Sequence, residues 1–511
     1  MKKISFLILL LLGSFVIDAQ SILLDKPFSN MWANRYSFGC IPLGQNADSK
    51  VMFLYSRAVS SFSSKTYTDQ IYLLNNDMQE KSVINVTASN RHDMLNAIVT
   101  DDKIIALYHT KDKSWKKLSY SIAIIDKDAE EYTVTDDRTV MVTEHAMCIP
   151  KYQSVKSPDG KMLASIVVIT DKNNMLKEIE AVVINDQGEF VWHGPIVPNF
   201  SGKYFSLGDM MVDNEGNVYM PAYTCNKNKD KVMDVQFLMI KTNGDGTNTY
   251  YADAAFGKPQ NFTGKVLANG DIMVAGYFTD TYKDIMTQSN GYFFYRFDTG
   301  TDNFTEGLSY DFSSNYAQKK APALLSNVLA NQQYSVRADG IYELENGDIV
   351  LCGEHRFAKE FYNIFDGSSS YQLLTKNILV STLKSDGTSI FSMIQKQQAS
   401  NYGSNPEDWR LMCISYTAFA NHNDMYFVFN DAPNNIPYPG KNDVCEMSSM
   451  FTNKTAQCVL MKLSPEQEIS QRVLPDGDKV MRVVEFSDED AFYVSSISKD
   501  GVHLNKFPIN Q

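Results

Sequence analysis

Ten residues decide how this chain folds: Leu267-Ala-Asn-Gly-Asp-Ile-Met-Val-Ala-Gly276, which return with small changes as Leu344-Glu-Asn-Gly-Asp-Ile-Val-Leu-Cys-Gly353. Each copy is a short Asn/Asp/Gly turn followed by an apolar run that is too short for a helix and typical of a buried strand. About eight looser copies of this phrase run along the chain, and one copy cannot bury its own faces. The copies are therefore expected to stack on one another.

The strand that follows each turn, called here the second strand, is predicted at 51–55, 104–109, 162–169, 218–223, 272–278, 349–354, 425–429 and 491–496. A third apolar strand is predicted after each of them, at 70–74, 121–125, 181–184, 236–240, 292–297, 378–383, 459–463 and 502–507. Most third strands end in a polar turn, and a weaker fourth strand such as 389–394 follows it.

Four short antiparallel strands per unit, repeated every ~55–75 residues, predict an all-β fold of the β-propeller class. The strands are apolar throughout, as expected when each blade is covered on both faces by its neighbours. We favour eight blades, with seven as the alternative because the first and last units are the least regular. The last unit has no room for a fourth strand, so the run Ser21-Ile-Leu-Leu-Asp25 is predicted to complete it and close the ring.

The first twenty residues have the pattern of a secretory signal peptide. Lys2 and Lys3 precede an apolar stretch over 4–17, which is too short for a comfortable membrane span, and Ala19 suits a cleavage site. We expect residues 1–20 to be removed and residues 21–511 to form a single propeller domain. That domain is expected to be exported, either to the periplasm or to the outer surface and medium. The first cysteine is Cys40, so N-terminal lipid anchoring is not expected.

Charge and composition restrict the partners. The formal net charge is −13, and nucleic acid and anionic lipid both require clustered Lys and Arg. No segment after the first twenty residues reaches 18 uninterrupted apolar residues, so no membrane span is expected. The remaining partner classes are a protein, a peptide or a glycan, and an envelope complex is one setting for such a protein.

The seven cysteines do not have the spacing of a metal site. No Cys-x-x-Cys or His-x-x-x-His occurs, so neither a metal nor a cofactor is expected. Cysteines of an exported protein can form disulfides. Cys445 and Cys458 flank one long connection and are the best candidates for a pair.

The connections between strands are of unequal length. Turns between first and second strands and between third and fourth strands are tight. The segments 279–290, 356–371 and 431–457 join second to third strands, and 309–336 and 396–411 join one blade to the next. In an up-and-down blade these two classes emerge on the same face, called here the loop face. Binding residues concentrate on loops that a rigid scaffold supports, so the loop face is the predicted working surface.

Candidate binding residues lie where second strands reach the loop face, together with one tryptophan in a blade-to-blade insertion. Aromatic and charged groups around a central depression form a plausible binding rim, although strand ends carry polar residues in any protein. One pair, Glu354-His355, joins an acid to an imidazole, but adjacent strand residues point to opposite faces. The candidates are Arg57, His109, Tyr223, Tyr277, Glu354, His355, Arg356, Trp409, Asn430 and Asp431.

Local catalytic motifs are absent. The chain contains no G-x-S-x-G elbow, no P-loop and no H-E-x-x-H. The leading hypothesis is an exported, non-catalytic binding or scaffold propeller that recognises a protein, peptide or glycan through the loop face. The alternative is a glycoside hydrolase or lyase with carboxylates or histidines converging in the central funnel, because the fold can pair two carboxylates without a local motif.

Two stretches resemble known proteins. Ser157-Pro-Asp-Gly-Lys161 resembles the turn of bacterial propellers with TolB-type repeats. The region 346–435 resembles uncharacterised exported propeller-like proteins of Bacteroidetes-type bacteria. The resemblance implies a fold and an exported location, and no activity or residue role comes with it. The segments that carry it are Asn346-Gly-Asp-Ile-Val-Leu-Cys-Gly-Glu354, Ile378-Leu-Val-Ser-Thr-Leu-Lys-Ser-Asp-Gly387, Ile394-Gln-Lys-Gln-Gln398 and Met425-Tyr-Phe-Val-Phe-Asn-Asp431.

Overall fold

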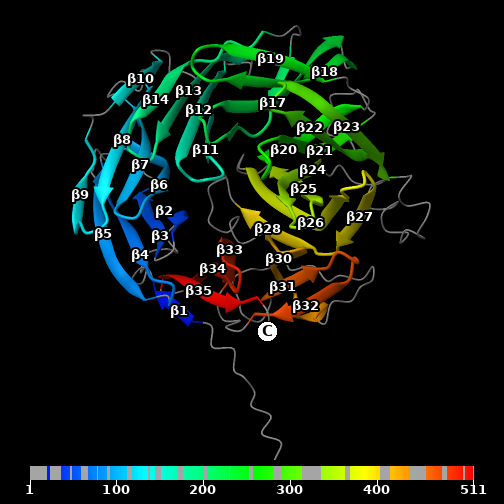
Figure 1. The fold of residues 1–511 in the computed structure, drawn as a ribbon. Helices are drawn as coiled ribbons and strands as arrows, with labels where there is room; N and C mark the ends of the chain where they lie inside the picture. Colours follow the sequence, from blue (N-terminus) through cyan, green and yellow to red (C-terminus); the bar gives the residue numbers. More distant parts are fainter. Residues whose placement is uncertain are drawn as a thin grey trace, which may run out of the picture.

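The chain forms an eight-bladed β-propeller in a computed structural model, seen along the ring axis in Figure 1. The predicted fold class and blade number are confirmed, and the alternative of seven blades is wrong. The structure describes residues 20–23, 36–46, 49–58, 67–77, 79–88, 92–111, 118–135, 139–143, 151–170, 176–199, 204–228, 231–252, 257–279, 289–312, 335–362, 369–402, 415–436, 456–474, 480–498 and 501–509.

The first four blades are consecutive in the chain. Blade one contains β2 (Tyr36–Gln45), β3 (Lys50–Ala58), β4 (Tyr67–Leu74) and β5 (Glu80–Ala88), with β9 (Glu131–Thr133) added in parallel to β5. Blade two contains β6 (His92–Val99), β7 (Lys103–Lys111), β8 (Leu118–Asp126) and β10 (Thr139–Thr143). Blade three contains β11 (Lys151–Lys156), β12 (Met162–Thr170), β13 (Leu176–Asn185) and β14 (Phe190–Pro195). Blade four contains β15 (Tyr204–Leu207), β16 (Met211–Val212), β17 (Val218–Asn228), β18 (Lys231–Thr242) and β19 (Thr247–Ala252).

The last four blades follow the same order. Blade five contains β20 (Lys258–Val266), β21 (Ile272–Thr279), β22 (Gly291–Asp298) and β23 (Asn303–Asp311). Blade six contains β24 (Ser335–Glu343), β25 (Ile349–Tyr362), β26 (Ser369–Leu383) and β27 (Ser389–Ile394), and β28 (Gln398–Tyr402) also pairs with β26. Blade seven contains β29 (Tyr416–Asn421), β30 (Asp424–Asp431), β31 (Gln457–Leu463) and β32 (Ile469–Val473). Blade eight contains β33 (Val480–Ser487), β34 (Ala491–Ser498), β35 (Gly501–Pro508) and β1 (Gln20–Leu23).

The start of the described chain closes the ring, as predicted. Strand β1 pairs antiparallel with β35, with Gln20 opposite Lys506 and Leu23 opposite His503. In Figure 1 the blue β1 therefore lies beside the red β35. Because β35 is the third strand of its blade, β1 covers an edge that would otherwise be open to another chain.

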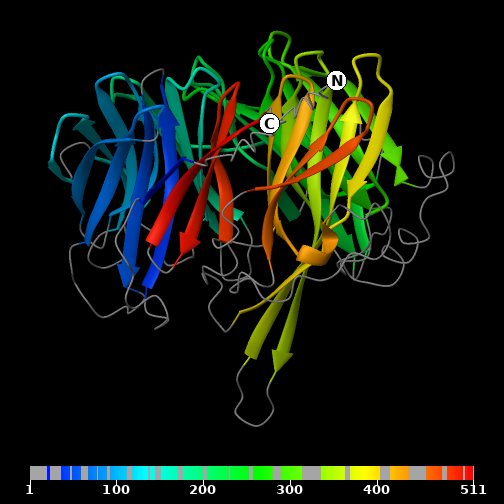
Figure 2. The same cartoon turned by 90° about the horizontal axis from the view of Figure 1, so that it is seen from below.

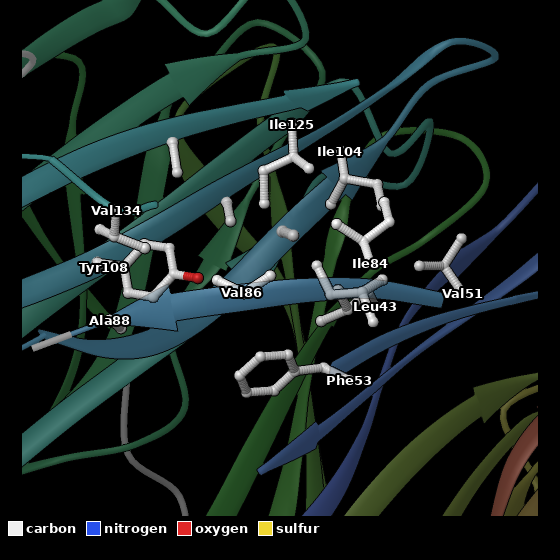
Figure 3. Packing of buried hydrophobic residues seen from close by; sticks show 14 of the residues in the cluster. Leu43, Val51, Phe53, Ile84, Val86, Ala88, Ile104, Tyr108, Ile125 and Val134 are labelled. Carbon is white, nitrogen blue, oxygen red and sulfur yellow. The ribbon is translucent and has the colours of Figure 1, made fainter. Parts of the chain in front are cut away.

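The core is divided among the blade interfaces. Clusters of buried apolar side chains lie between each pair of consecutive blades from one to eight. Figure 3 shows the one between blades one and two, where Val51 and Phe53 share a cluster with Ile104 and Tyr108. This arrangement explains the unbroken apolar runs of the second and third strands, because both faces of each sheet are covered.

The interface between blade eight and blade one has a polar side. Lys50 Nζ lies 3.0 Å from Asp488 Oδ2 and 4.4 Å from the ring centroid of Tyr493. Lys506 Nζ donates to the Asn76 carbonyl oxygen at 2.9 Å. Asn76, Asp488, Tyr493 and Lys506 are among the residues that line a surface cavity of about 600 Å³. One ion pair and one hydrogen bond from a lysine therefore join the first blade to the last at this end of the interface.

Blade six continues beyond the ring. Its β25 and β26 remain paired as far as Tyr362 and Ser369, and β28 pairs with the same part of β26, with Tyr402 opposite Tyr371. Figure 2 shows this part, called here the extension, protruding from one face of the ring. Within the predicted insertion 356–371 the described residues 356–362 and 369–371 are thus strand, and 396–411 contains β28, because runs rich in Phe, Tyr and Leu favour continued pairing.

Other predicted boundaries also shift by a few residues. Asp431 still belongs to β30, and a 3₁₀ turn, η3 (Pro433–Asn435), follows it. No helix in the described part of the chain has the length and hydropathy needed to cross a membrane. Every predicted second and third strand falls within a strand of the structure.

Candidate functional site

Three β-bulges coincide where blade six reaches the loop face. Asp339 is the extra residue of β24, since Ala338 and Gly340 face consecutive residues of β25. On β26, two residues, 376 and 377, lie opposite one residue of β25. Between β27 and β28, the three residues 395–397 lie opposite the two residues 376 and 377 of β26. A bulge redirects a side chain out of the strand alternation, and bulges are common next to functional sites.

Glu354, at the centre of these bulges, is fully buried and bonded by three cationic or polar groups. Its Oε1 forms an ion pair with Lys396 Nζ, and neither side chain has any exposed surface. Its Oε2 accepts hydrogen bonds from Arg356 Nε at 2.7 Å and from Ser415 Oγ at 2.8 Å. A buried carboxylate requires such partners, because its desolvation otherwise costs several kcal/mol. Glu354, Lys396, Arg356, Ser415 and Asp339 are called here the Glu354 network.

Lys396 connects the network to the extension and to blade seven. Its Nζ donates to Thr375 Oγ1 at 2.9 Å and to Gln398 Oε1 at 3.1 Å. Gln398 Nε2 in turn donates to the carbonyl oxygen of Asn430 at 2.6 Å. Burial lowers the pKa of Lys396 and the Glu354 carboxylate opposes that shift. The base of the extension is therefore bonded to its own blade and to the next one.

The outer half of the network is partly open to solvent. Asp339 Oδ1 lies 3.1 Å from Arg356 Nη2 and 3.4 Å from Arg337 Nε. The side chains are 18% exposed for Asp339, 24% for Arg356 and 59% for Arg337. Burial raises the pKa of Asp339 to about 6, against the opposing charge of Arg356. A ligand on the loop face can thus reach this half and not Glu354.

Ser415 joins the two blades with an unusual backbone. Its φ is +85°, a region that residues other than glycine seldom adopt. Its N–H donates to Gln398 Oε1 at 2.7 Å, and its Oγ lies 2.9 Å from Arg356 Nη2. These bonds stabilise a conformation that the residue would otherwise avoid.

Glycine at 353, the last residue of the repeated phrase, permits a close approach between blades. A Cβ there would lie 2.5 Å from the Tyr277 hydroxyl of blade five and 2.6 Å from the Arg337 carbonyl oxygen. Tyr277 is fully buried, and burial raises its pKa well above the ordinary value. The predicted candidate Tyr277 therefore packs against the strand that carries Glu354.

The structure brings several predicted residues together. Glu354 and Arg356 share the network, and Asn430 contacts it through its carbonyl group. Asp431 lies on the same strand, where its Oδ1 accepts from Ala432 N at 2.8 Å and Asn435 Nδ2 at 2.6 Å. Burial raises the pKa of Asp431, and Lys396 opposes that shift.

His355 belongs to the same strand as Glu354 but not to the ionic network. It is buried, and burial lowers its pKa to about 4. The imidazole is therefore neutral at neutral pH. It cannot act as a cationic partner of Glu354 under those conditions.

Other candidates lie on separate blades. His109 of blade two has Nε2 3.1 Å from Asp93 Oδ2 and stacks on Tyr152 with ring centroids 4.3 Å apart. Tyr223 of blade four packs edge-on against Phe262 at 6.1 Å. A single rim that joins all ten candidates stays a prediction.

The structure describes no side-chain position for three further candidates, which are Arg57, Trp409 and Cys445. Arg57 lies opposite Ser37 on β3, and Trp409 falls outside the described residues. Cys458 is buried on β31. Cys445 falls outside the described residues, so their disulfide stays a prediction.

Sequence reasoning missed Asp339, Lys396 and Ser415. Two of them have a visible signal, because Asp339-Gly340 is a turn-type pair just before the repeated phrase and Gln395-Lys-Gln-Gln398 follows an apolar strand without a turn residue. A polar run where a strand continues is a sign of a bulge. Ser415 has no comparable signal.

The two carboxyl groups of the Glu354 network differ in their access to solvent. Cleavage of a glycoside needs two carboxyl groups that both face the substrate. Glu354 is enclosed and its oxygens are occupied, so of the two network carboxyls only Asp339 faces solvent. Among the described residues, no three His, Cys, Asp or Glu side chains are grouped as metal ligands would be.

Comparison with known proteins extends no further than the fold. No family model matches the chain, and no curated protein matches it. The similar solved structures include the Dos1 propeller (7% identity, 95% of this chain and 97% of that one, TM-score 0.38). They also include the polysaccharide lyase Uly1 (9%, 81% and 89%, 0.37) and Drosophila Semaphorin 1b (8%, 96% and 88%, 0.34). Likenesses this distant carry no argument about activity, and membership of the Bacteroidetes-type family stays a prediction.

Proposed function

We propose that the protein is an exported, non-catalytic binding or scaffold propeller that recognises a protein, peptide or glycan on the loop face of blades six and seven. The observation that carries the proposal is the Glu354 network at the base of the extension. Burying charged groups costs desolvation free energy even when they are paired, so such a set is better explained if the geometry that it fixes is needed. Here it fixes a three-stranded projection to two blades.

The location of the network supports recognition at this place. It lies where predicted candidates from blades five, six and seven meet, and its Asp339–Arg356 half is partly exposed. Functional groups placed on rigid elements and supported by a buried second layer of bonds are well positioned for a ligand. The export component rests on the pattern of residues 1–20 alone.

The enzyme hypothesis has one observation in its favour. Asp339 is a partly exposed carboxyl whose pKa, at about 6, is suited to proton transfer near neutral pH. It would need a second reacting group facing the same ligand. If an envelope glycan is cleaved by the protein and the Asp339→Asn variant is inactive, the non-catalytic proposal is wrong.

A shortened extension tests the proposal. Ala358 and Leu373 are register partners, so replacing 359–372 by Asn-Gly leaves a closed hairpin and keeps every member of the Glu354 network. Wild type and variant are coupled to resin and exposed to an envelope fraction and to a glycan array. We expect the variant to retain at least ~10-fold less of each partner than wild type does, since the proposal assigns most of the contact to the projecting surface.

The matched control changes the opposite face. Replacing the half-buried Asp186 and the exposed Gln187 in the tight turn between β13 and β14 by alanine should leave binding unchanged. Each captured partner is then purified and titrated against the three proteins. Equal affinity of a partner for wild type and for the shortened variant would exclude the extension as the binding surface.

A further inference from the structure

The Glu354 network and its neighbours carry excess positive charge in an acidic protein. The whole chain has a formal net charge of −13. Around the bulges of blade six, four basic groups lie among three acidic ones: Arg337, Arg356, Lys376 and Lys396, with Asp339, Glu354 and Asp431. Such a local reversal of sign favours an anionic ligand.

The geometry directs that charge outward. Two guanidinium groups converge on one oxygen, Asp339 Oδ1, at 3.1 Å from Arg356 and 3.4 Å from Arg337. Glu354 and Lys396 satisfy each other in the interior, so they do not compete for a ligand on the surface. Planar guanidinium groups match the two oxygens of a carboxylate, and Asp339 already occupies that position from inside the protein.

We propose that Arg337 and Arg356 form a binding site for a ligand carboxylate, which replaces the Asp339 carboxylate on the two guanidinium groups. The proposal rests on the proposed function, since it names the chemistry that the loop face recognises. Asp339 lies on a bulge and is followed by Gly340, so its side chain can turn away while the strand pairs on either side remain. The shared chemistry is a carboxylate, and a uronic sugar or a peptide C-terminus can supply it.

Displacement couples binding to a proton. The charged and titratable groups around Asp339 come from five segments: Tyr277 on β21, Arg337 and Tyr342 on β24, Cys352, Glu354 and Arg356 on β25, Lys396 after β27, and Tyr416 on β29. Burial has raised its pKa to about 6, and a displaced Asp339 that stays buried beside the strand keeps this effect and loses the opposing charges of the two arginines, so its pKa rises further. Asp339 therefore takes up a proton as the ligand binds. The ligand carboxylate, with a pKa of about 3–4, stays ionised.

The sign of the pH dependence follows. Above pH 6 Asp339 is ionised in the free protein, so binding one anion consumes one proton. The association constant should then rise up to ~10-fold for each unit of pH decrease, and level off below pH 6. A simple surface site of two arginines would show no such slope between pH 6 and 8.

Saturation-transfer NMR titrations of the chain from residue 20 test the inference. The probes are D-glucuronate and N-acetyl-L-alanine, with D-glucose and N-acetyl-L-alanine amide as neutral controls, at pH 6, 7 and 8. We expect the anions to bind and the neutral compounds not to bind. Tighter binding of glucuronate indicates a uronic sugar, and tighter binding of N-acetyl-L-alanine indicates a peptide terminus. Absence of anion binding at pH 6 overturns the site.

Two variants separate the roles. Asp339→Asn should bind the better anion at least ~10-fold more tightly at pH 8 and show a flat pH profile. Arg337→Gln, at a largely exposed side chain, should weaken binding at least ~10-fold at pH 6 without threatening folding. If the association constant of Asp339→Asn depends on pH as steeply as that of wild type, the ligand does not displace the Asp339 carboxylate. If the shortened variant loses its partners but the wild-type protein binds no anion, the proposed function stands. Only the inference of a carboxylate site is then wrong.

Discussion

Replacing Lys396 by methionine is expected to lower the free energy of unfolding by about 3–5 kcal/mol. The substitution removes the ammonium group that pairs with Glu354 Oε1 while keeping a side chain of similar length. Glu354 would keep Arg356 and Ser415 on Oε2, but its buried Oε1 would lose its cationic partner, and a buried carboxylate oxygen without a partner is strongly unfavourable. The large effect comes from the charge that is left behind.

Equilibrium unfolding in guanidinium chloride, followed by circular dichroism, measures this effect. The exposed Lys161 of the β11–β12 turn provides the control, and Lys161→Met should change stability by less than about 0.5 kcal/mol. The double variant Glu354→Gln/Lys396→Met should be less destabilised than the sum of its two single variants, since neither charge remains. A loss below about 1 kcal/mol for Lys396→Met would show that the pair is not buried as described.

A chain that starts at residue 25 is expected to be less stable than one that starts at residue 20 by about 2–4 kcal/mol, at roughly 1 kcal/mol for each hydrogen bond lost. Truncation removes β1 and with it the pairing to β35, which runs from Gln20 opposite Lys506 to Leu23 opposite His503. It also exposes the outer edge of β35, which can then pair with another molecule. We therefore expect aggregation as well as a lower midpoint of thermal unfolding.

Thermal unfolding and light scattering after size-exclusion chromatography compare the two chains. The chain from residue 20 serves as the control, because it lacks the first nineteen residues and keeps all of β1. A separate four-residue peptide should not restore the strand efficiently, because a free peptide loses more conformational entropy on binding than a segment already attached to the chain. If the two chains have equal midpoints and both remain monomeric, β1 does not close the ring.

The strands were predictable because their signals are local. Asn346-Gly347-Asp348 is a turn whose glycine has φ of +82°, and the apolar run after it becomes β25. The same logic holds for Asn269-Gly270-Asp271, where φ of Gly270 is +89°. Repetition of this unit implied stacking, and stacking implied eight interfaces closed by an apolar N-terminal run.

The candidate site was predictable only in part. Glu354 and Arg356 were named because they end a second strand, and register alone places them at the loop face. Asp339 and Lys396 were missed because each belongs to a bulge, and a bulge reverses the strand alternation on which the register argument depends. The extension was mistaken for a loop because its length was taken as an insertion, whereas β25 and β26 stay paired beyond the blade and β28 adds to β26 from after the fourth strand.

By itself, the sequence predicted the class of fold, favoured eight blades over seven and assigned the long connections to one face. These properties follow from turn residues and apolar periodicity, which act over a few residues. Only the tertiary structure decided that Glu354 is enclosed and that Asp339 faces Arg337 and Arg356. The physical reason is that burial and charge pairing depend on which strands lie side by side. Residues 339, 396 and 415 meet only after blades six and seven have packed together.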